Sequence, residues 1–134
     1  MGSKNLYSDH YKGKTILVAG GAGAVGSRLT KKLCDLGAES VVVIDDLSSA
    51  YKWNIPDEPN LLFIKGSITD EVTLKRAFAE KPEIVFHLAA FFANQNSIDY
   101  PQTDLTTNGF GTLLLLQYAA MTGVDRFVYA SSGC

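Results

Sequence analysis

Three spaced glycines, Gly20, Gly23 and Gly26, follow an apolar run that ends at Ala19 and precede a stretch with helical periodicity. In a strand-to-helix turn, the first glycine permits a tight bend, the second lets a phosphate approach bare backbone, and the third allows close helix packing. The first amide groups of the following helix have no intrahelical partners, and the helix dipole places partial positive charge there. The spacing therefore predicts a site for the pyrophosphate of a dinucleotide.

Asp45 ends the next apolar run and lies 19 residues beyond Gly26. An acid about 20 residues after such glycines accepts hydrogen bonds from the ribose hydroxyls of adenosine. Its charge also repels the 2′-phosphate of NADP, so we predict that the cofactor is NAD. The alternative is an ordinary glycine turn followed by a solvated Asp45, which the matching register of the two features disfavours.

The composition fits one soluble globular domain and excludes several classes of protein. The 134 residues are 46% hydrophobic and 19% charged, with a formal net charge of −2. Because no stripe of lysine and arginine is present, we predict no nucleic-acid partner. No apolar stretch approaches the ~20 residues of a membrane span, and the first residues do not resemble a signal peptide, so we predict a cytoplasmic protein without membrane contact. The two cysteines, Cys34 and Cys134, predict neither a disulfide nor a metal site.

Short apolar runs alternate with helical patterns from Lys14 onward. Runs this uniformly apolar are typical of strands buried on both faces, and the connections have the length of parallel crossovers. Gly37 and Gly123 follow predicted helices, as left-handed C-terminal caps do. Thr69-Asp70-Glu71 places capping and acidic residues at the start of another helix. We predict strands at residues 15–19, 41–45, 61–65, 84–88 and 126–130, and helices at 24–36, 70–80 and 101–122.

These elements predict an α/β fold with a doubly wound parallel sheet, the Rossmann fold, in three α/β/α layers. Right-handed crossovers give the strand order 3-2-1-4-5. The order reverses between the first and fourth strands, and ligands bind in the crevice at the carboxyl ends of those strands. Residues 1–13 are predicted to be a flexible N-terminal arm, and residues 14–134 an incomplete dinucleotide-binding domain that stops after the fifth strand.

Five segments together resemble one family. They are VAGGAGAVG at 18–26, DDLSS at 45–49, VFHLAA at 85–90, NGFGT at 108–112 and FVYASS at 127–132. In this order and spacing they are similar to the N-terminal part of the extended short-chain dehydrogenase/reductases, the NAD-dependent epimerase/dehydratase family. The resemblance covers residues 14–134 and implies a cofactor-binding part without its substrate domain.

The resemblance implies contacts along the whole dinucleotide groove. Ser67 departs from the family pattern, since a hydroxyl stands where the family usually has a carboxylate beside the adenine amino group. Asn108 is implied to be structural. The implied contacts are Gly20, Gly23, Ala24 and Val25 with the pyrophosphate; Asp45 with the adenosine ribose; Asp46, Leu47, Ser48 and Ser49 with the adenine end; Ser67 and Ile68 with adenine; Leu88, Ala89 and Ala90 with the groove; and Thr107 with the nicotinamide ribose.

The catalytic chemistry that the resemblance implies needs a hydroxyl, a tyrosine and a lysine. Ser132 aligns with the hydroxyl that contacts the substrate and is the candidate catalytic residue. In a Tyr-x-x-x-Lys pair, the lysine lowers the tyrosine pKa so that the phenolate accepts a proton while hydride leaves for NAD. None of the six tyrosines has a lysine four residues on. We therefore expect this chain to be part of a longer enzyme and to be inactive alone.

Within the family, the residues after Ser132 favour a nucleotide-sugar 4-epimerase. Dehydratases and decarboxylases tend to place an acid one or two residues after the hydroxyl, whereas Gly133 and Cys134 stand here. An epimerase needs only reversible hydride transfer at a sugar carbon and rotation of the keto intermediate. The implied partners are a nucleotide-diphosphate sugar and a second copy of the chain, bound through the apolar helix at 101–122. The alternatives are a dehydratase, decarboxylase or reductase of the family, and a non-catalytic NAD-binding module; the spaced glycines disfavour a flavodoxin-like binder.

Five further residues carry interpretations that the structure can decide. His87 is expected to be a hydrogen-bonded core histidine rather than a catalyst. Phe91 and Phe92 either cover a sugar or the nicotinamide, or fill a loop. Gly109 and Gly111 lie in a predicted helix, where each costs about 1 kcal/mol relative to alanine, and we expect close packing on the sheet to offset that cost.

Overall fold

The computed structural model describes residues 6–131 and shows a five-stranded parallel sheet. The strands are β1 (Thr15–Ala19), β2 (Ser40–Asp45), β3 (Leu61–Lys65), β4 (Ile84–His87) and β5 (Arg126–Tyr129). Their order is β3-β2-β1-β4-β5, as predicted. β1 lies between β2 and β4, so that Ala19 is paired with Ile44 on one side and with His87 on the other. The carboxyl ends of β1 and β4 therefore meet at the point where the strand order reverses.

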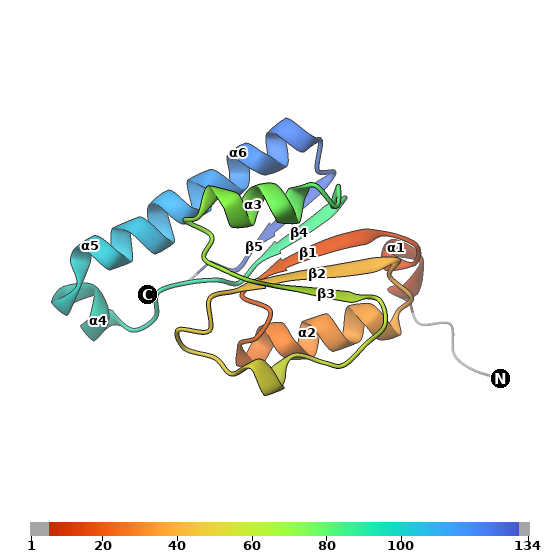
Figure 1. The fold of residues 1–134 in the computed structure, drawn as a ribbon, viewed down its shortest axis with the longest axis horizontal. Helices are drawn as coiled ribbons and strands as arrows, with labels where there is room; N and C mark the ends of the chain where they lie inside the picture. The colour runs from red at the N-terminus through yellow and green to blue at the C-terminus, as the bar shows by residue number, and fades with distance from the viewer. Residues whose placement is uncertain (1–5, 132–134) are drawn as a thin grey trace.

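Helices cover both faces of this sheet and complete three layers (Figure 1). The helical segments are α1 (Ser8–Tyr11), α2 (Ala24–Asp35), η1 (Lys52–Asn54), α3 (Glu71–Phe78), α4 (Asn94–Asp99), α5 (Pro101–Asp104), η2 (Leu105–Gly111) and α6 (Thr112–Thr122). On one face, Leu74 of α3 and Leu115 of α6 pack with Leu17. On the other face, Leu33 of α2 packs with Ile16. Neighbouring strand residues enter opposite cores because successive side chains point to opposite faces, and the predicted doubly wound fold is confirmed.

One end of each of three helices follows from its capping residue. The Asp70 carboxylate accepts hydrogen bonds from the amides of Val72 and Thr73 at the start of α3. The Thr73 hydroxyl and these amides lower the pKa of Asp70, because they stabilise its charged form. Gly37 and Gly123 follow α2 and α6 with φ of 86° and 74°, the left-handed conformation that favours glycine. The two glycine caps were predicted from the sequence, and of the three residues predicted to cap and charge the start of α3, Asp70 is the cap.

The helix predicted at 101–122 is interrupted by a wider turn. α5 and α6 are joined by η2, a π-helical segment of seven residues. A methyl group at Gly111 would lie 2.6 Å from Cδ1 of Ile68, so this glycine lets the helix approach the segment after β3. The expected offset by packing is thus present at Gly111, although against Ile68 rather than the sheet. At Gly109 a methyl group would meet only the Leu105 side chain of the same helix, and packing does not explain this glycine.

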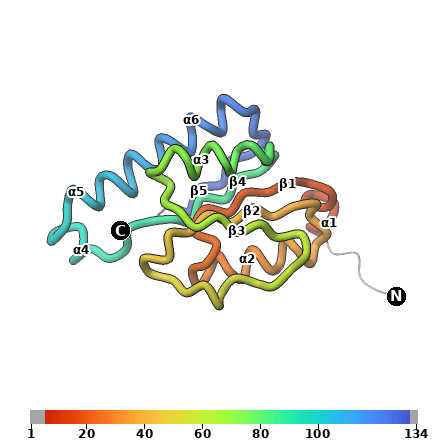
Figure 2. The backbone as a smooth tube through the Cα atoms, in the orientation of Figure 1, coloured from red at the N-terminus to blue at the C-terminus, as the bar shows by residue number. Residues whose placement is uncertain are grey.

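The remaining differences from the prediction are at element ends and in short helices. β4 ends at His87 and β5 at Tyr129, one residue before the predicted ends, and such bounds carry little meaning. After β4 the chain runs out beyond the sheet through α4 before it returns through α5 to α6 (Figure 2). α1, η1 and α4 were not predicted, because helices of three to six residues are too short to show a 3.6-residue period.

Part of the predicted N-terminal arm contacts the core. Ser8–Tyr11 form α1, and the ring of Tyr11 lies 6.3 Å from that of Phe86, centroid to centroid. Tyr11 is partly buried and packs against the core that contains Leu33 of α2. Among the helices of residues 6–131, none combines the length and apolar character that crossing a bilayer requires.

Candidate cofactor-binding site

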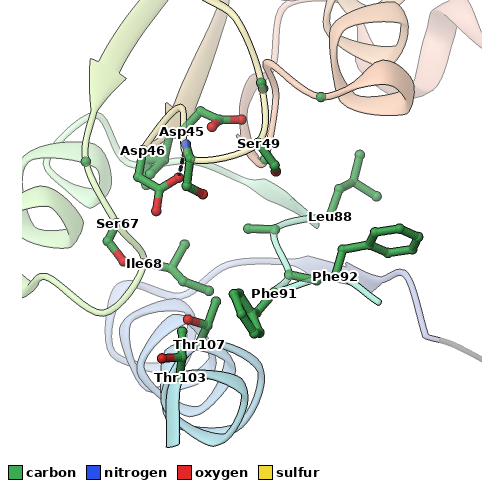
Figure 3. Close-up of a pocket in the computed structure, with 18 of the residues that line it drawn as sticks. Asp45, Asp46, Ser49, Ser67, Ile68, Leu88, Phe91, Phe92, Thr103 and Thr107 are labelled. Atoms are coloured by element: carbon green, nitrogen blue, oxygen red, sulfur yellow. Dashed lines mark hydrogen bonds between the residues drawn. The ribbon is translucent and has the colours of Figure 1, made fainter. Parts of the chain in front are cut away.

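A cavity of about 410 Å³ lies at the carboxyl ends of the strands, at the predicted reversal of strand order. The glycine turn after β1, the segments after β2, β3 and β4, and the helix α5–η2 all contribute to its walls (Figure 3). Twelve of the fifteen residues predicted to contact the cofactor line this cavity: Gly20, Gly23, Asp45, Asp46, Ser48, Ser49, Ser67, Ile68, Leu88, Ala89, Ala90 and Thr107. The fold therefore collects residues from five segments of the sequence at one place.

The other three predicted cofactor residues lie outside the cavity lining. Ala24 and Val25 are the first residues of α2 and are exposed, and their backbone amides belong to the first turn of the helix, whose amides lack intrahelical partners. Leu47 has a φ of 62°, and its amide donates to Oδ1 of Asp45 at 2.9 Å. Ser132, the candidate catalytic residue, lies outside the described residues. The contacts of all these residues with a ligand remain predictions.

The three glycines of the turn after β1 have different steric environments. Gly20 has a φ of 84°, and a methyl group there would lie 2.7 Å from the backbone nitrogen of Ala89. A methyl group at Gly26 would overlap the carbonyl oxygen of Gly20. At Gly23 it would meet only that carbonyl oxygen, at 3.5 Å, which is ordinary contact. Gly20 and Gly26 are therefore required by the turn itself, whereas Gly23 leaves open space where a phosphate would approach.

The amino end of α2 is free to bind an anion. Gly23 is its N-terminal cap and offers no side chain to the first amides of the helix. These amides carry partial positive charge, and the helix of 12 residues adds its dipole. The turn thus provides the unpaired donors that a pyrophosphate needs.

Asp45 holds the glycine turn as well as facing the cavity. Its Oδ2 accepts the amide of Ala22 at 3.0 Å, and the side chain of Asn54 donates to the carbonyl of the same Ala22 at 3.1 Å. Ala22 is fully buried, so both of its backbone groups need these partners. Each carboxylate oxygen of Asp45 retains a further lone pair for the ribose hydroxyls. Sequence reasoning missed Asn54, because nothing in its loop position signals a contact 32 residues away.

Asn108 fixes the segment that follows β4. Its Oδ1 accepts the amide of Phe91 at 2.7 Å, and its Nδ2 donates to the Phe91 carbonyl at 3.0 Å and to Asp104. The predicted structural role of Asn108 is confirmed. Both Phe91 and Phe92 line the cavity, with Phe92 80% exposed, so they border the ligand space rather than fill a loop core.

Several lining residues were not predicted. Asn96 and Thr103 belong to the segment between β4 and η2 and present polar side chains at the cavity. Thr103 precedes the predicted Thr107 by four residues, one helical turn, and this spacing was the signal that would have found it. Asn96 carries no such signal, because the helix α4 was not recognised. The other lining residues that were not predicted are Ile44, Ala50 and Gly66.

The arrangement can be compared with known proteins. The sequence model of the NAD-dependent epimerase/dehydratase family matches residues 16–134. The chain belongs to this family. It is 41% identical over 121 residues to a UDP-glucose 4-epimerase of Mycolicibacterium smegmatis, which covers 87% of this chain and 38% of that protein.

Two solved structures similar to this chain agree with it in fold. An epimerase from Methanothermobacter thermautotrophicus is 57% identical with a TM-score of 0.92, over 95% of this chain and 38% of that one. The Bordetella bronchiseptica enzyme WbmF, in complex with NAD+, is 38% identical with a TM-score of 0.84, over 92% of this chain and 38% of that one. This family member therefore spans about 38% of the length of each of these relatives.

His87 is a core residue in this family member, as expected. It is 1% exposed, and its Nε2 shares a hydrogen bond of 2.7 Å with the hydroxyl of Thr112. Its ring stacks on Tyr129 with centroids 5.1 Å apart. Among the described residues its Nδ1 has no hydrogen-bond partner. Burial lowers the pKa of His87 to about 4, so the ring is neutral at pH 7 and ties β4 to α6.

Acid is expected to destabilise the protein through His87. Between pH 6.5 and 4 an unfolded histidine binds a proton that the folded one does not, so the contribution of His87 to stability is complete above pH 6.5 and is lost as the pH falls. The loss approaches about 3 kcal/mol near pH 4. Urea denaturation at several pH values in this range gives the free energy of unfolding as a function of pH. As the pH falls, this free energy should decrease more steeply in the wild type than in His87→Leu. An equal dependence on pH in the two proteins would contradict the assignment.

Proposed function

We propose that this chain is the NAD-binding part of a nucleotide-sugar 4-epimerase. The proposal rests on two groups that border the same cavity. They are the amino end of α2, whose cap Gly23 offers no side chain, and the carboxylate of Asp45 at the end of β2. The helix amino end suits a pyrophosphate, and the carboxylate suits a ribose. The two groups follow neighbouring strands, as the pyrophosphate and the adenosine ribose of a bound dinucleotide require. Family membership and relatives that are epimerases support the reaction class.

Each group of residues has a defined task in this proposal. The amino end of α2 binds the pyrophosphate, Asp45 holds the adenosine ribose, and Thr107 contacts the nicotinamide ribose. NAD, when bound, supplies the hydride acceptor and later returns the hydride. Ser132 contacts the reacting sugar hydroxyl. The acid/base pair is expected in the part of the protein that corresponds to the remaining length of the relatives.

The first test is binding of NAD and NADP to the protein that carries this chain. Calorimetric titration should show that NAD binds about 100-fold more tightly than NADP. In NADP a phosphate replaces the 2′-hydroxyl of the adenosine ribose, so the Asp45 carboxylate loses a hydrogen-bond donor and meets a negative charge instead. A protein that binds neither dinucleotide would contradict the proposal at its base. One that binds NAD but converts no nucleotide sugar would favour the non-catalytic module instead.

The second test distinguishes the reactions of the family. Incubation with UDP-glucose, followed by NMR of the products, should show inversion at C4 of the sugar and no 4-keto-6-deoxy product. Gly133 and Cys134, rather than an acid, stand at the two positions after Ser132 and favour this outcome, since elimination of water requires an acid or base near the sugar. Formation of the 4-keto-6-deoxy sugar would instead assign the protein as a dehydratase.

The helix of α5, η2 and α6 is the proposed homodimer surface. It exposes five large apolar side chains, Leu105, Phe110, Leu113, Leu116 and Met121. Such a patch on a helix is typical of a contact surface. Light scattering of the purified protein tests the proposal, and a monomer at micromolar concentration would exclude it. A cytoplasmic location remains a prediction.

A further inference from the structure

The positions of the cofactor residues assign the base of the dinucleotide to the end of β3. The pyrophosphate site follows β1 and the ribose carboxylate Asp45 follows β2, the next strand in the sheet. The cofactor extends in the same direction past Asp45, so its base meets the segment after β3. That segment supplies Ser67 and Ile68, which lie below Asp46 on the cavity wall in Figure 3. Ile68, 3% exposed, provides the apolar surface, and Ser67 is the polar group of that segment that borders the base.

The Ser67 hydroxyl belongs to a pair that can reverse its direction. Ser67 Oγ accepts the amide of Thr69 at 3.1 Å and lies 2.7 Å from the Thr69 hydroxyl, with either oxygen able to donate. When Ser67 donates to Thr69, one of its lone pairs stays available and accepts a hydrogen bond from a ligand. When Thr69 donates to Ser67, the Ser67 proton becomes available and is donated to a ligand. The same hydroxyl thus serves a ligand donor or a ligand acceptor.

The two carboxylates near the base, Asp45 and Asp46, come from the segment after β2, and each accepts backbone amides there or in the glycine turn. Asp45 accepts the amides of Ala22 and Leu47, one on each oxygen. Asp46 accepts the amide of Ser48 at 2.9 Å on its Oδ1. A carboxylate can only accept, so one at the base edge would select an amino group and reject a carbonyl. The segment after β3 has no carboxylate before Asp70, whose side chain caps α3.

We propose that this base site does not distinguish a 6-amino purine from a 6-oxo purine. The protein binds nicotinamide hypoxanthine dinucleotide, which carries a 6-oxo group and a proton on N1, with an affinity close to that for NAD. Reversal of the Ser67–Thr69 pair compensates for the exchange of a donor for an acceptor at position 6 of the base. The proposal rests on the proposed function, since it requires that the cavity bind the dinucleotide.

Competitive calorimetry with NAD and nicotinamide hypoxanthine dinucleotide tests the proposal. The two dissociation constants of the wild type should agree within about threefold, because either base finds a partner at Ser67. Ser67→Asp, which presents only acceptors, should prefer NAD by at least about tenfold. Ser67→Ala, the conservative control, should weaken both dinucleotides equally.

The outcomes separate the two proposals. A wild type that prefers NAD by tenfold or more overturns the inference, and loss of that preference in Asp46→Asn would identify Asp46 as the reader of the base. A Ser67→Asp variant that binds both dinucleotides equally also overturns it, because Ser67 would then not face the base. If neither dinucleotide binds the wild type, the proposed function fails rather than the base assignment.

Discussion

Gly26→Ala is expected to destroy NAD binding together with the glycine turn, whereas Gly23→Ala is expected to destroy NAD binding alone. A methyl group at Gly26 would overlap the carbonyl oxygen of Gly20, a backbone atom that cannot move without opening the turn. We expect a loss of about 3 kcal/mol in the free energy of unfolding. At Gly23 the methyl group has room, with Gly20 O at 3.5 Å, and the backbone angles, φ −70° and ψ 175°, suit alanine.

Gly23→Ala is thus a probe of the ligand rather than of the fold. Its thermal midpoint should stay close to that of the wild type, while its dissociation constant for NAD rises about 10- to 100-fold, because the methyl group keeps the pyrophosphate from the backbone amides. Thermal unfolding and calorimetric titration measure the two effects separately. Wild-type affinity in Gly23→Ala would show that the pyrophosphate lies elsewhere.

Asp45→Ala is expected to weaken NAD binding by about 100-fold, since two ribose hydroxyls lose a charged acceptor. The same change frees the amide of buried Ala22 and the amide of Leu47, so part of the loss comes through a looser glycine turn. Asp45→Asn separates these contributions, because an amide oxygen can still accept one of those bonds while the charge is gone.

The comparison of NAD with NADP tests the role of the Asp45 charge. In Asp45→Asn the preference for NAD over NADP should fall by about tenfold or more, because the 2′-phosphate no longer meets a carboxylate. Asp46→Asn is the comparison variant: it removes the charge of the neighbouring carboxylate, which lines the same cavity and accepts the amide of Ser48, and it should change the preference for NAD over NADP less than Asp45→Asn does. An unchanged preference in Asp45→Asn would mean that another residue excludes NADP.

The fold was predictable because its signals are local or follow from connection rules. The glycine spacing, the strand-end acid and the apolar runs each occupy one short stretch, and right-handed crossovers convert their order into the sheet order. The same rule placed the cavity at the reversal between β1 and β4. The π-helical segment between Leu105 and Gly111 had no such signal, since a single wide turn leaves the apolar pattern of a helix intact.

The sequence by itself determined the strand order, the glycine turn and the place of Asp45, because each depends on neighbours in the chain or on a fixed rule of topology. Most of the other cavity residues were identified by the resemblance to the family rather than by local pattern. Only the tertiary structure decided what holds those residues in place. Asn54 contacts Ala22 from 32 residues away, and Asn108 contacts Phe91 from 17 residues away. Partners this distant in sequence become neighbours only when the sheet and its helices have assembled, so no local pattern records them.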